Sequence, residues 1–524
     1  MQGKKYYQPK LFKHMELASR VPKNNFYRRL KENLDLRFLY KLTENYYGVC
    51  GQKSVDPVVF FKLCLIGYLE NIISDRKLIE HCSMRLDILY FLEYDIDEEL
   101  PWHSTISRTR QLLPEQVFEE VFNTVFIMCV EKGMVAGHTQ VIDSAPVKAN
   151  ASMDSLELKV PEEELEAHLQ KIRYMSTPDR QHTKRKAKGN KASDQQRKIQ
   201  ASDRELKELG SRNKKWSQDQ DERPGAKSKN AKYTSNKTHY SPTDPDARIS
   251  VKPGKARKLN YTAQLSVDTA HHVISDIMAD YADKKDNQSL EQITRRVKGR
   301  LDKEGLLWHA IVADTGYSSG ENYAFLEREG IRSFIPPHGT YKGCPDDFTY
   351  NDEGNYYLCR NNKRLQFKGT KPNVKGIKVN HYATVRKDCR GCTYAPACKG
   401  KSYEKRITVT YYKPEYKRAI ERIQSKQGKY LKKKRQSTVE PVLGTMTQFM
   451  GLRRINTIGI RQAHKVMLLA AVAYNIKKYL KFTKTLTETM VKEARMTALY
   501  LSRQLGLFLN SFKTFKICNP ISLM

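Results

Sequence analysis

Two short apolar segments of this 524-residue chain each run directly into an aspartate. The segment Thr139–Asp143 ends at Asp143, and His309–Ala313 is followed at once by Asp314. Short apolar runs bounded by polar residues are typical of buried strands. Strands must pair in a sheet, and pairing brings residues from distant parts of a sequence together. The two aspartates are therefore the first candidates for a shared site.

The order of the surrounding elements restricts the topology of that sheet. Further strands are predicted at Tyr261–Val267, His272–Ala279 and Ile331–Ile335, and helices at Asn287–Lys303 and Glu321–Glu329. The first three strands fit an antiparallel meander, and the later ones join through helical crossovers. The predicted elements therefore follow the order of a ribonuclease-H-like core: three strands, a helix, a strand, a helix and a last strand. In that mixed α/β arrangement the ends of the first and fourth strands, which carry Asp143 and Asp314, lie side by side.

Residues 1–135 show helical periodicity. Between Val117 and Val130 the apolar positions recur at i and i+4, which is typical of an amphipathic helix, and Gly133 is a plausible terminator. We predict an all-helical N-terminal domain at 1–135, serving either DNA binding through a helix-turn-helix or dimerisation as a bundle. The α/β domain is expected at 136–480, followed by a helical C-terminal tail at 481–524.

Two long insertions interrupt the predicted core. The first, 155–250, is rich in Lys, Arg, Gln and Ser and contains the run Lys184, Arg185 and Lys186. Such a composition buries little apolar surface, so we expect an exposed segment that is either a DNA-backbone contact arm or an elaborated linker. The second insertion, 337–425, contains most of the clustered cysteines.

Charge restricts the class of partner. The chain has 93 Lys and Arg against 58 Asp and Glu, a formal net charge of +35. Basic residues spread along a chain attract phosphate backbones, so we expect a nucleic-acid partner; a generally basic or ribosome-associated protein is the alternative. No segment reaches the ~18 apolar residues of a membrane span, and the N-terminus lacks a signal-peptide core, so we expect a cytoplasmic protein without a membrane partner.

Carboxylates on a chain with a polyanionic partner favour metal-dependent phosphodiester chemistry. Two Mg²⁺ (or Mn²⁺) ions about 4 Å apart stabilise the attacking and leaving oxygens, and hard oxygen ligands hold them. Asp143 and Asp314 would be joined by Glu440, far downstream. The competing carboxylates are Asp244, Asp246, Asp268, Asp280 and Asp286. We expect the first two in a solvated loop, and Asp280 and Asp286 as loop or helix-capping residues.

Four cysteines have a spacing that fits structural zinc. They are Cys359, Cys389, Cys392 and Cys398. Tetrahedral zinc takes four ligands, and a close Cys-x2-Cys pair is typical of one half of such a site. Cys344 is an alternative fourth ligand and His381 a weaker one. The competing interpretation is a set of reduced cysteines packed in a compact insertion.

Four stretches of the sequence, in this order, resemble bacterial insertion-sequence transposases of the DDE class. They are Asp143–Ala149, Thr243–Ala247, Ala313–Tyr317 and Val439–Gly444. The segments Val55–Pro57 and Trp102–Arg108 are similar to the helical N-terminal domain of those enzymes, so the resemblance extends over residues 20–480. It implies that Asp143, Asp314 and Glu440 form the catalytic triad.

The resemblance also implies an activity. Such enzymes bind the terminal inverted repeats of a mobile element, cleave DNA at its ends and transfer the strands into target DNA, as a homodimer or larger assembly at the bacterial nucleoid. One large branch carries Tyr, Arg and Lys around the glutamate, and here those positions hold Lys433, Gln436 and Thr447. Arg435, out of register, is either a phosphate contact or an exposed cation. The alternatives are a non-catalytic zinc-containing DNA-binding protein and a ribonuclease-H-fold repair or resolving nuclease.

Overall fold

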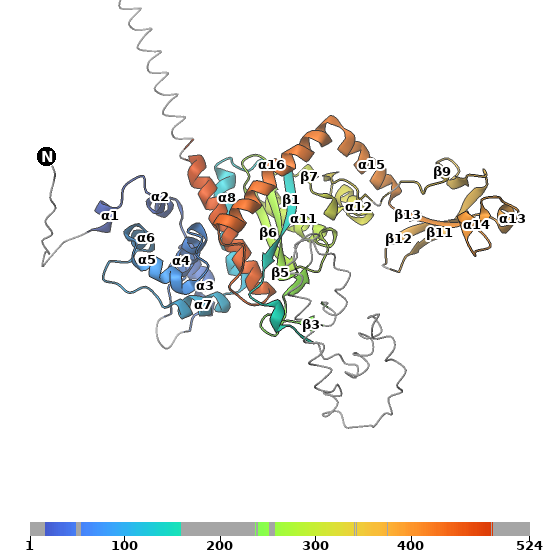
Figure 1. Cartoon of the computed structure of the whole chain (residues 1–524). Coiled ribbons are helices and arrows are strands. Elements are labelled where there is room, and N and C mark those ends of the chain that lie inside the picture. Colours follow the sequence, from blue (N-terminus) through green and yellow to red (C-terminus); the bar gives the residue numbers. More distant parts are fainter. Residues whose placement is uncertain are drawn as a thin grey trace, which may run out of the picture.

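The computed structural model describes residues 16–48, 54–158, 236, 239–250, 257–339, 341, 343–374, 376–483 and 485. The basic run Lys184–Lys186 and the predicted tail beyond 485 lie outside the described residues. Three parts follow one another along the molecule: a group of N-terminal helices, a central sheet covered by helices, and a small β-sheet at the far end (Figure 1). Among the described residues, no helix combines the length and the apolarity needed to span a membrane.

The N-terminal part is helical, as predicted. Its elements are α1 (Leu17–Arg20), α2 (Phe26–Asn33), α3 (Phe38–Thr43), η1 (Glu44–Tyr46), α4 (Pro57–Leu69), α5 (Asp75–Ser83), α6 (Leu86–Leu92), α7 (His103–Leu112) and α8 (Glu115–Glu131). The Asp56 side chain caps α4 by accepting from the backbone N–H groups of Val58 and Val59. Since α4 is apolar on all sides, it lies in the centre of this part.

The central sheet has the strands predicted from the sequence. They are β1 (Thr139–Lys148), β5 (Lys258–Asp268), β6 (Ile274–Tyr281), β7 (Ala310–Val312) and β8 (Arg332–Phe334), with β4 (Arg248–Ser250) added beside β5. β5 pairs antiparallel with both β1 and β6, whereas β1, β7 and β8 pair in parallel. The crossover helices are α11 (Asp286–Lys303) and α12 (Gly320–Arg328). A short outlying pair, β2 (Glu157–Leu158) and β3 (His239–Tyr240), forms a separate sheet.

The register between β1 and β7 places the two aspartates at the same level. Thr139 pairs with Ala310 and Val141 with Val312. Asp314 follows β7 with extended backbone, at φ −80° and ψ 178°. The same offset continued along both chains therefore sets Asp143 opposite Asp314, as the order of the elements predicted.

One continuous apolar core runs from the N-terminal helices through the central sheet to a final helix over residues 460–483. α8 contributes the face predicted from its periodicity, including Val117, Phe122 and Phe126. The final helix is buried over most of its length, in contact with the same core. The predicted domain boundaries at 135 and 480 stay predictions.

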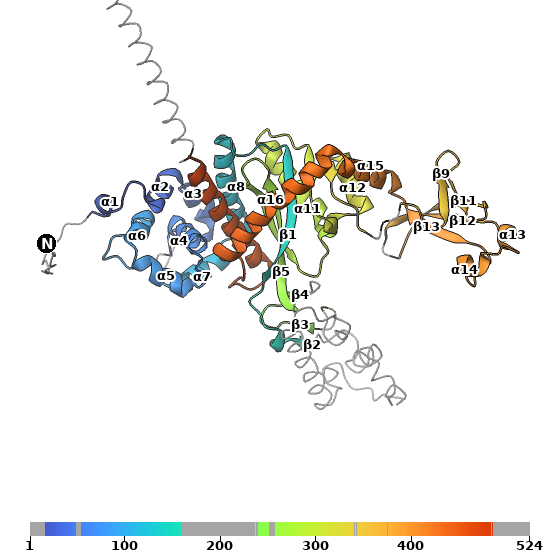
Figure 2. The ribbon, with the colours of Figure 1, turned by 45° about the horizontal axis from the view of Figure 1, so that its top comes forward.

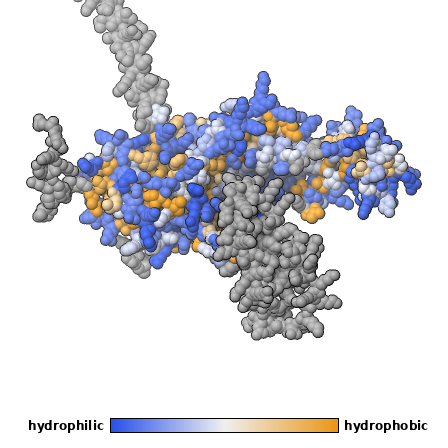
Figure 3. All heavy atoms as spheres, viewed as in Figure 1, coloured by the Kyte–Doolittle hydropathy of each residue, from blue (hydrophilic) through white to orange (hydrophobic). Residues whose placement is uncertain are grey.

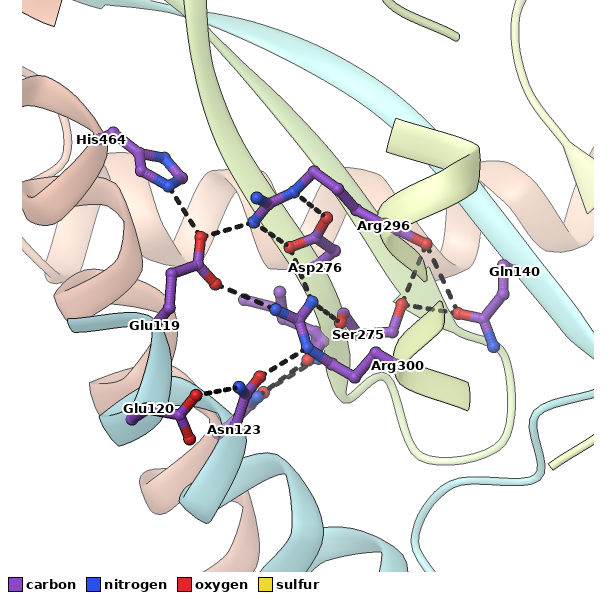
Figure 4. Close-up of polar contacts among 12 residues, drawn as sticks. Glu119, Glu120, Asn123, Gln140, Ser275, Asp276, Arg296, Arg300 and His464 are labelled. Carbon is purple, nitrogen blue, oxygen red and sulfur yellow. Dashed lines mark hydrogen bonds and ion pairs between the residues drawn. The ribbon is translucent and has the colours of Figure 1, made fainter. Parts of the chain in front are cut away.

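A buried charge network joins these layers (Figure 4). Asp276 on β6 is fully buried and accepts hydrogen bonds from Arg296 Nε at 2.7 Å and Arg300 Nη1 at 2.7 Å, both on α11. Glu119 of α8 accepts from the same two arginines at 2.7 and 3.0 Å. His464 of the final helix contacts Glu119 at 2.9 Å. The network therefore fastens α8 and the final helix to the sheet.

The insertion after β8 forms its own antiparallel sheet (Figure 2). Its strands are β9 (Phe348–Asn351), β10 (Tyr356–Cys359), β11 (Arg364–Pro372), β12 (Lys378–Ala383) and β13 (Arg406–Thr410), with the short helices α13 (Arg386–Cys389) and α14 (Ala395–Lys399). The chain returns to the central sheet along α15 (Lys413–Gln424) and α16 (Lys426–Phe449). The face seen in Figure 3 is mostly hydrophilic over this insertion, with apolar patches over the N-terminal helices.

Candidate active site

Asp143 lies on β1 beneath the helix α16. One of its oxygens, Oδ1, accepts from the backbone N–H of Ser144 at 2.8 Å, and Oδ2 accepts from Arg435 Nη1 at 2.8 Å. Burial raises the pKa of Asp143 to about 6, and the charges of Asp314 and Asp286 add to this, against the Ser144 hydrogen bond and Arg435. An added positive charge at this position would stabilise the ionised carboxylate.

Asp314 begins a short 3-10 helix, η5 (Thr315–Tyr317), directly after β7. Its Oδ1 accepts from the backbone N–H of Gly316 at 2.8 Å. This hydrogen bond closes the turn and holds the carboxylate at the end of the strand. The turn therefore fixes Asp314 beside Asp143 while leaving the rest of its carboxylate available.

A third aspartate, Asp286, also belongs to this group. It is the first residue of α11, and its Oδ1 accepts from Gln264 Nε2 at 3.2 Å. A Cβ added to Gly316 would lie 3.0 Å from Asp314 Oδ1 and 3.1 Å from Asp286 Oδ2. The two carboxylates thus flank the same glycine, and the interpretation of Asp286 as only a capping residue was incomplete.

Beneath these carboxylates lies a buried polar pair. Tyr317 is fully buried and donates its hydroxyl to Gln264 Oε1 at 2.5 Å. Burial raises the pKa of Tyr317 well above its usual value, and the charges of Asp286, Asp143 and Asp314 contribute to this shift. Since Gln264 also binds Asp286, the pair orients that carboxylate. The sequence analysis did not single out Gln264, because polar residues alternate with apolar ones along β5 and nothing local marks this one.

Glu440 lies on α16, on the same side of the sheet as Arg435. Its side chain is 58% exposed, and Oε1 is 3.8 Å from Arg435 Nη2. Arg435 therefore stands between Asp143 and Glu440 and contacts both. Of the two interpretations from the sequence, the exposed cation is wrong, because the Arg435 side chain is only 18% exposed and is paired with carboxylates.

Whether these residues fit divalent metal ions depends on the type of their donor atoms and on the arrangement of the carboxylates around Gly316. Within the described residues, no three His, Cys, Asp or Glu side chains are gathered closely enough to hold a metal ion. Carboxylate oxygens are nevertheless the donors that Mg²⁺ prefers. The charges of Asp286, Asp143 and Asp314 all contribute to the raised pKa of Tyr317, and the carboxylates of Asp314 and Asp286 flank Gly316. The donor set fits the ion, and Arg435 occupies part of the space between the donors.

The other aspartates have structural roles. The expected solvated loop at Asp244 and Asp246 is wrong, because Asp244 is fully buried and accepts from Tyr261 at 2.7 Å. Asp244 and Asp246 also accept from the backbone N–H groups of Gly459 and Ile460, which begin the final helix and need acceptors. Asp268 accepts from the backbone N–H of Gly137 at 2.9 Å.

Asp280 completes the set of competing carboxylates. It is buried, and it accepts from Ser289 Oγ at 2.6 Å and pairs with Lys284 at 2.8 Å. Those contacts join the end of β6 to the first turns of α11. The expected loop or capping role is wrong, because Asp280 lies within β6 and bonds side chains instead of capping α11.

The four cysteines of the second insertion lie around one small cavity. Cys359, Cys389, Cys392 and Cys398 all line it, and its volume is about 110 Å³. The two alternative ligands lie elsewhere: Cys344 donates to the carbonyl oxygen of Phe348 at 2.9 Å, and His381 lies 3.4 Å from Thr408 Oγ1. The structure therefore places the four residues that the spacing selected around one cavity, without gathering three of them closely enough to hold a metal ion.

Comparisons with known proteins agree with this arrangement. Residues 15–112 match a family described as "Transposase domain (DUF772)", and residues 358–480 match "Transposase DDE domain". The second match includes Glu440 and the four cysteines, whereas Asp143 and Asp314 lie outside both matches. Both families are transposase domains. The two matched families support an insertion-sequence transposase of the DDE class.

Two further comparisons add little. No curated protein matches the chain. One solved structure that it resembles is described as "Cryo-EM structure of piggyBac transposase synaptic complex with hairpin DNA (SNHP)", with 10% sequence identity over 89% of this chain and 77% of that chain. Its TM-score of 0.29 is too low to support an argument about fold or activity.

Proposed function

We propose that this transposase binds the terminal inverted repeats of its element, cleaves DNA at the element ends and transfers the strands into target DNA. The observation that carries the proposal is the convergence of Asp143 and Asp314 at one level of two parallel strands, under the helix that bears Glu440. A ribonuclease-H-like core is the corresponding fold, supported by the strand order with β5 and β6 antiparallel and β7 and β8 parallel.

Asp143, Asp314 and Glu440 would hold the divalent ions. Bound Mg²⁺ or Mn²⁺ supplies stabilisation of the attacking and leaving oxygens of the phosphodiester. The chain itself contributes the positions of the carboxylates: the β1–β7 register sets two of them, and the Gly316 hydrogen bond fixes the orientation of Asp314. Arg435 neutralises Asp143 and Glu440 while no ion is bound, which limits repulsion between the carboxylates.

The exposed face of α16 supports DNA binding next to this site. Lys426, Lys429, Lys433 and Gln436 are exposed and recur every three or four residues, on the face that carries Glu440. Lysines in such a row attract a phosphate backbone and lead it toward the carboxylates. Strand transfer requires two element ends to be held together, so the proposal includes a homodimer or larger assembly on DNA.

The test is a cleavage and strand-transfer assay with Mg²⁺ on duplex DNA that carries the terminal repeats of the element. Asp143→Asn, Asp314→Asn and Glu440→Gln are compared with the wild type, with DNA binding measured in parallel. Metal ligands supply several kcal/mol of transition-state stabilisation, so each variant should lose both reactions by on the order of 10²–10³-fold and keep its DNA binding. Glu321→Gln is the matched control, since Glu321 is exposed and lies in the first turn of α12, the next helix after Asp314.

Each other outcome has a definite meaning. Normal cleavage by Glu440→Gln would show that the third ligand is wrong, and Asp286 would be the next candidate. Cleavage without strand transfer by the wild type would favour a repair or resolving nuclease. A wild-type protein that binds the repeats but never reacts would favour a non-catalytic DNA-binding protein.

A further inference from the structure

The cavity at the outer end of the insertion is lined by thiols from three separate segments. Cys359 ends β10, Cys389 ends α13, Cys392 follows in the next turn, and Cys398 lies in α14. All four are free and partly buried. Thiols that converge from three segments on one cavity are the arrangement that a tetrahedral metal site needs.

The backbone between Cys389 and Cys392 makes a tight reversal. Gly391 has a φ of +75°, a conformation that residues with a side chain rarely adopt. The turn continues with a hydrogen bond from the Ala395 backbone N–H to the Cys392 carbonyl at 3.0 Å. Because of this reversal, both thiols of the Cys-x2-Cys pair line the same cavity instead of pointing apart.

Polar groups of neighbouring strands and turns contact two of the sulfurs. Thr384 Oγ1 lies 3.1 Å from Cys389 Sγ, and Asn361 Nδ2 donates to Cys392 Sγ at 3.7 Å. Such contacts orient metal ligands and stabilise the thiolate form. A thiol that only packs in an apolar core does not need such polar contacts.

The charge around the cavity fits a thiolate cluster as well. A zinc ion with four thiolates carries a net negative charge, since two positive charges meet four negative ones. Four basic residues, Arg360, Lys363, Lys399 and Lys405, line the same cavity together with two acidic ones, Asp347 and Asp388. Arg360 pairs with Asp347, and the excess of positive charge that remains has the sign that a zinc–thiolate cluster needs.

The insertion also has little else to stabilise it. Its own core cluster holds four buried apolar residues among those described, namely Tyr357, Leu365, Tyr382 and Ile407, and Val379 and Ala383 are buried beside them on β12. This core is separate from that of the central sheet. Very small cores rarely stabilise a fold alone, and disulfides or structural metals commonly supply the remainder. No disulfide joins the described cysteines.

We propose that Cys359, Cys389, Cys392 and Cys398 bind a structural zinc ion that holds the ends of this insertion together. The sulfurs are not yet gathered at binding distance. Zinc–sulfur bonds are about 2.3 Å long, so the thiols must turn toward the centre of the cavity, which has room for the ion. Zinc binding thus draws together β10, α13 and α14.

The test measures zinc in the full-length chain, purified with a phosphine reductant and reconstituted with zinc alone. Mass spectrometry of the metal content should give one zinc ion per chain, released when a mercurial reagent modifies the thiols. Cys389→Ser and Cys392→Ser should lose the ion. Limited proteolysis should then cut the insertion much faster while the N-terminal helices stay protected.

Three controls make the result specific. Cys344→Ser, in the same insertion but outside the cavity, should keep its zinc. Asp143→Asn should also keep it, which separates this site from the carboxylate site. Cys398→His should retain zinc, because imidazole replaces thiolate in such sites. A reduced wild type that takes up no zinc, or a loss of zinc in Cys344→Ser equal to that in Cys389→Ser, would overturn the proposal.

Discussion

Replacing Asp276 with asparagine should weaken the fold more than any surface change. Asp276 is fully buried, and its oxygens accept from Arg296 and Arg300 at 2.7–2.9 Å (Figure 4). With Glu119, the network balances two positive and two negative charges. The variant leaves two guanidinium groups facing one carboxylate, and its amide places N–H groups where only acceptors fit.

The magnitude follows from the burial of the partners. Breaking a buried ion pair by removal of one partner costs about 3–5 kcal/mol. Arg300 is 12% exposed and Arg296 28%, so water partly compensates the arginines and the lower end of that range is expected. A loss of about 3 kcal/mol in the free energy of unfolding is therefore predicted for Asp276→Asn.

Urea unfolding followed by circular dichroism measures this loss, with hydrogen exchange of α11 and β6 as a local readout. Glu291→Gln is the matched control, because Glu291 pairs with Arg295 on the exposed side of the same helix and should cost at most about 0.5 kcal/mol. If the free energy of unfolding of Asp276→Asn lies within about 0.5 kcal/mol of the wild-type value, the network does not fasten the layers, and the reasoning is refuted.

The same network predicts a dependence on pH. Burial alone would raise the pKa of Asp276, but Arg300 and Arg296 outweigh it, so the pKa in the folded chain is below the usual value. The stabilisation is therefore complete above the unfolded pKa of about 3.9 and is lost as the pH falls through the lower folded value. The difference in stability between wild type and Asp276→Asn should shrink in acid.

Two further predictions concern the site and its approach. Gly316→Ala would bring a methyl group to 3.0 and 3.1 Å from two carboxylate oxygens, so cleavage should require more Mg²⁺ while Gly299→Ala, with open space around it, should behave as wild type. An unchanged Mg²⁺ dependence would contradict this. Replacing both Lys429 and Lys433 with glutamine should reduce the slope of log affinity against log salt by up to about 1.8, and an unchanged slope would show that they do not contact phosphates.

The convergence of Asp143 and Asp314 was predictable because periodicity and element order determine which strands of a small sheet are neighbours. Asp143 and Asp314 each follow a strand that the pattern identifies, and the order of strands and helices makes those strands neighbours. Asp286 was considered as a competing carboxylate and was assigned a loop or capping role, because an acidic residue at the start of a helix is also what a capping role would place there. Its contact with Gln264 depends on the packing of α11 against β5, which no local pattern contains.

Tertiary contacts also explain where the structure differs from the sequence-based predictions at other positions. The segment around Asp244 has the composition of a solvated turn, yet its carboxylates satisfy the first N–H groups of a helix more than 200 residues later. The strands of the second insertion were not predicted, because alternation is weak where few positions are buried. The cysteine spacing, by contrast, selected the four cysteines that line the cavity.

The position of Glu440 depends on the contacts that hold the two ends of the second insertion together, and not on the sheet inside the insertion. The chain leaves the central sheet after β8 and returns along α15, where Arg422 donates to Ser333 Oγ of β8 at 2.7 Å and pairs with Glu327 of α12. Arg418 pairs with Glu327 as well, at 2.6 Å. Once these contacts hold the two ends together, a longer loop adds only about 0.6 kcal/mol of closure cost for each doubling of its length. Loss of zinc should therefore loosen the outer sheet while α16 still carries Glu440 to the two aspartates.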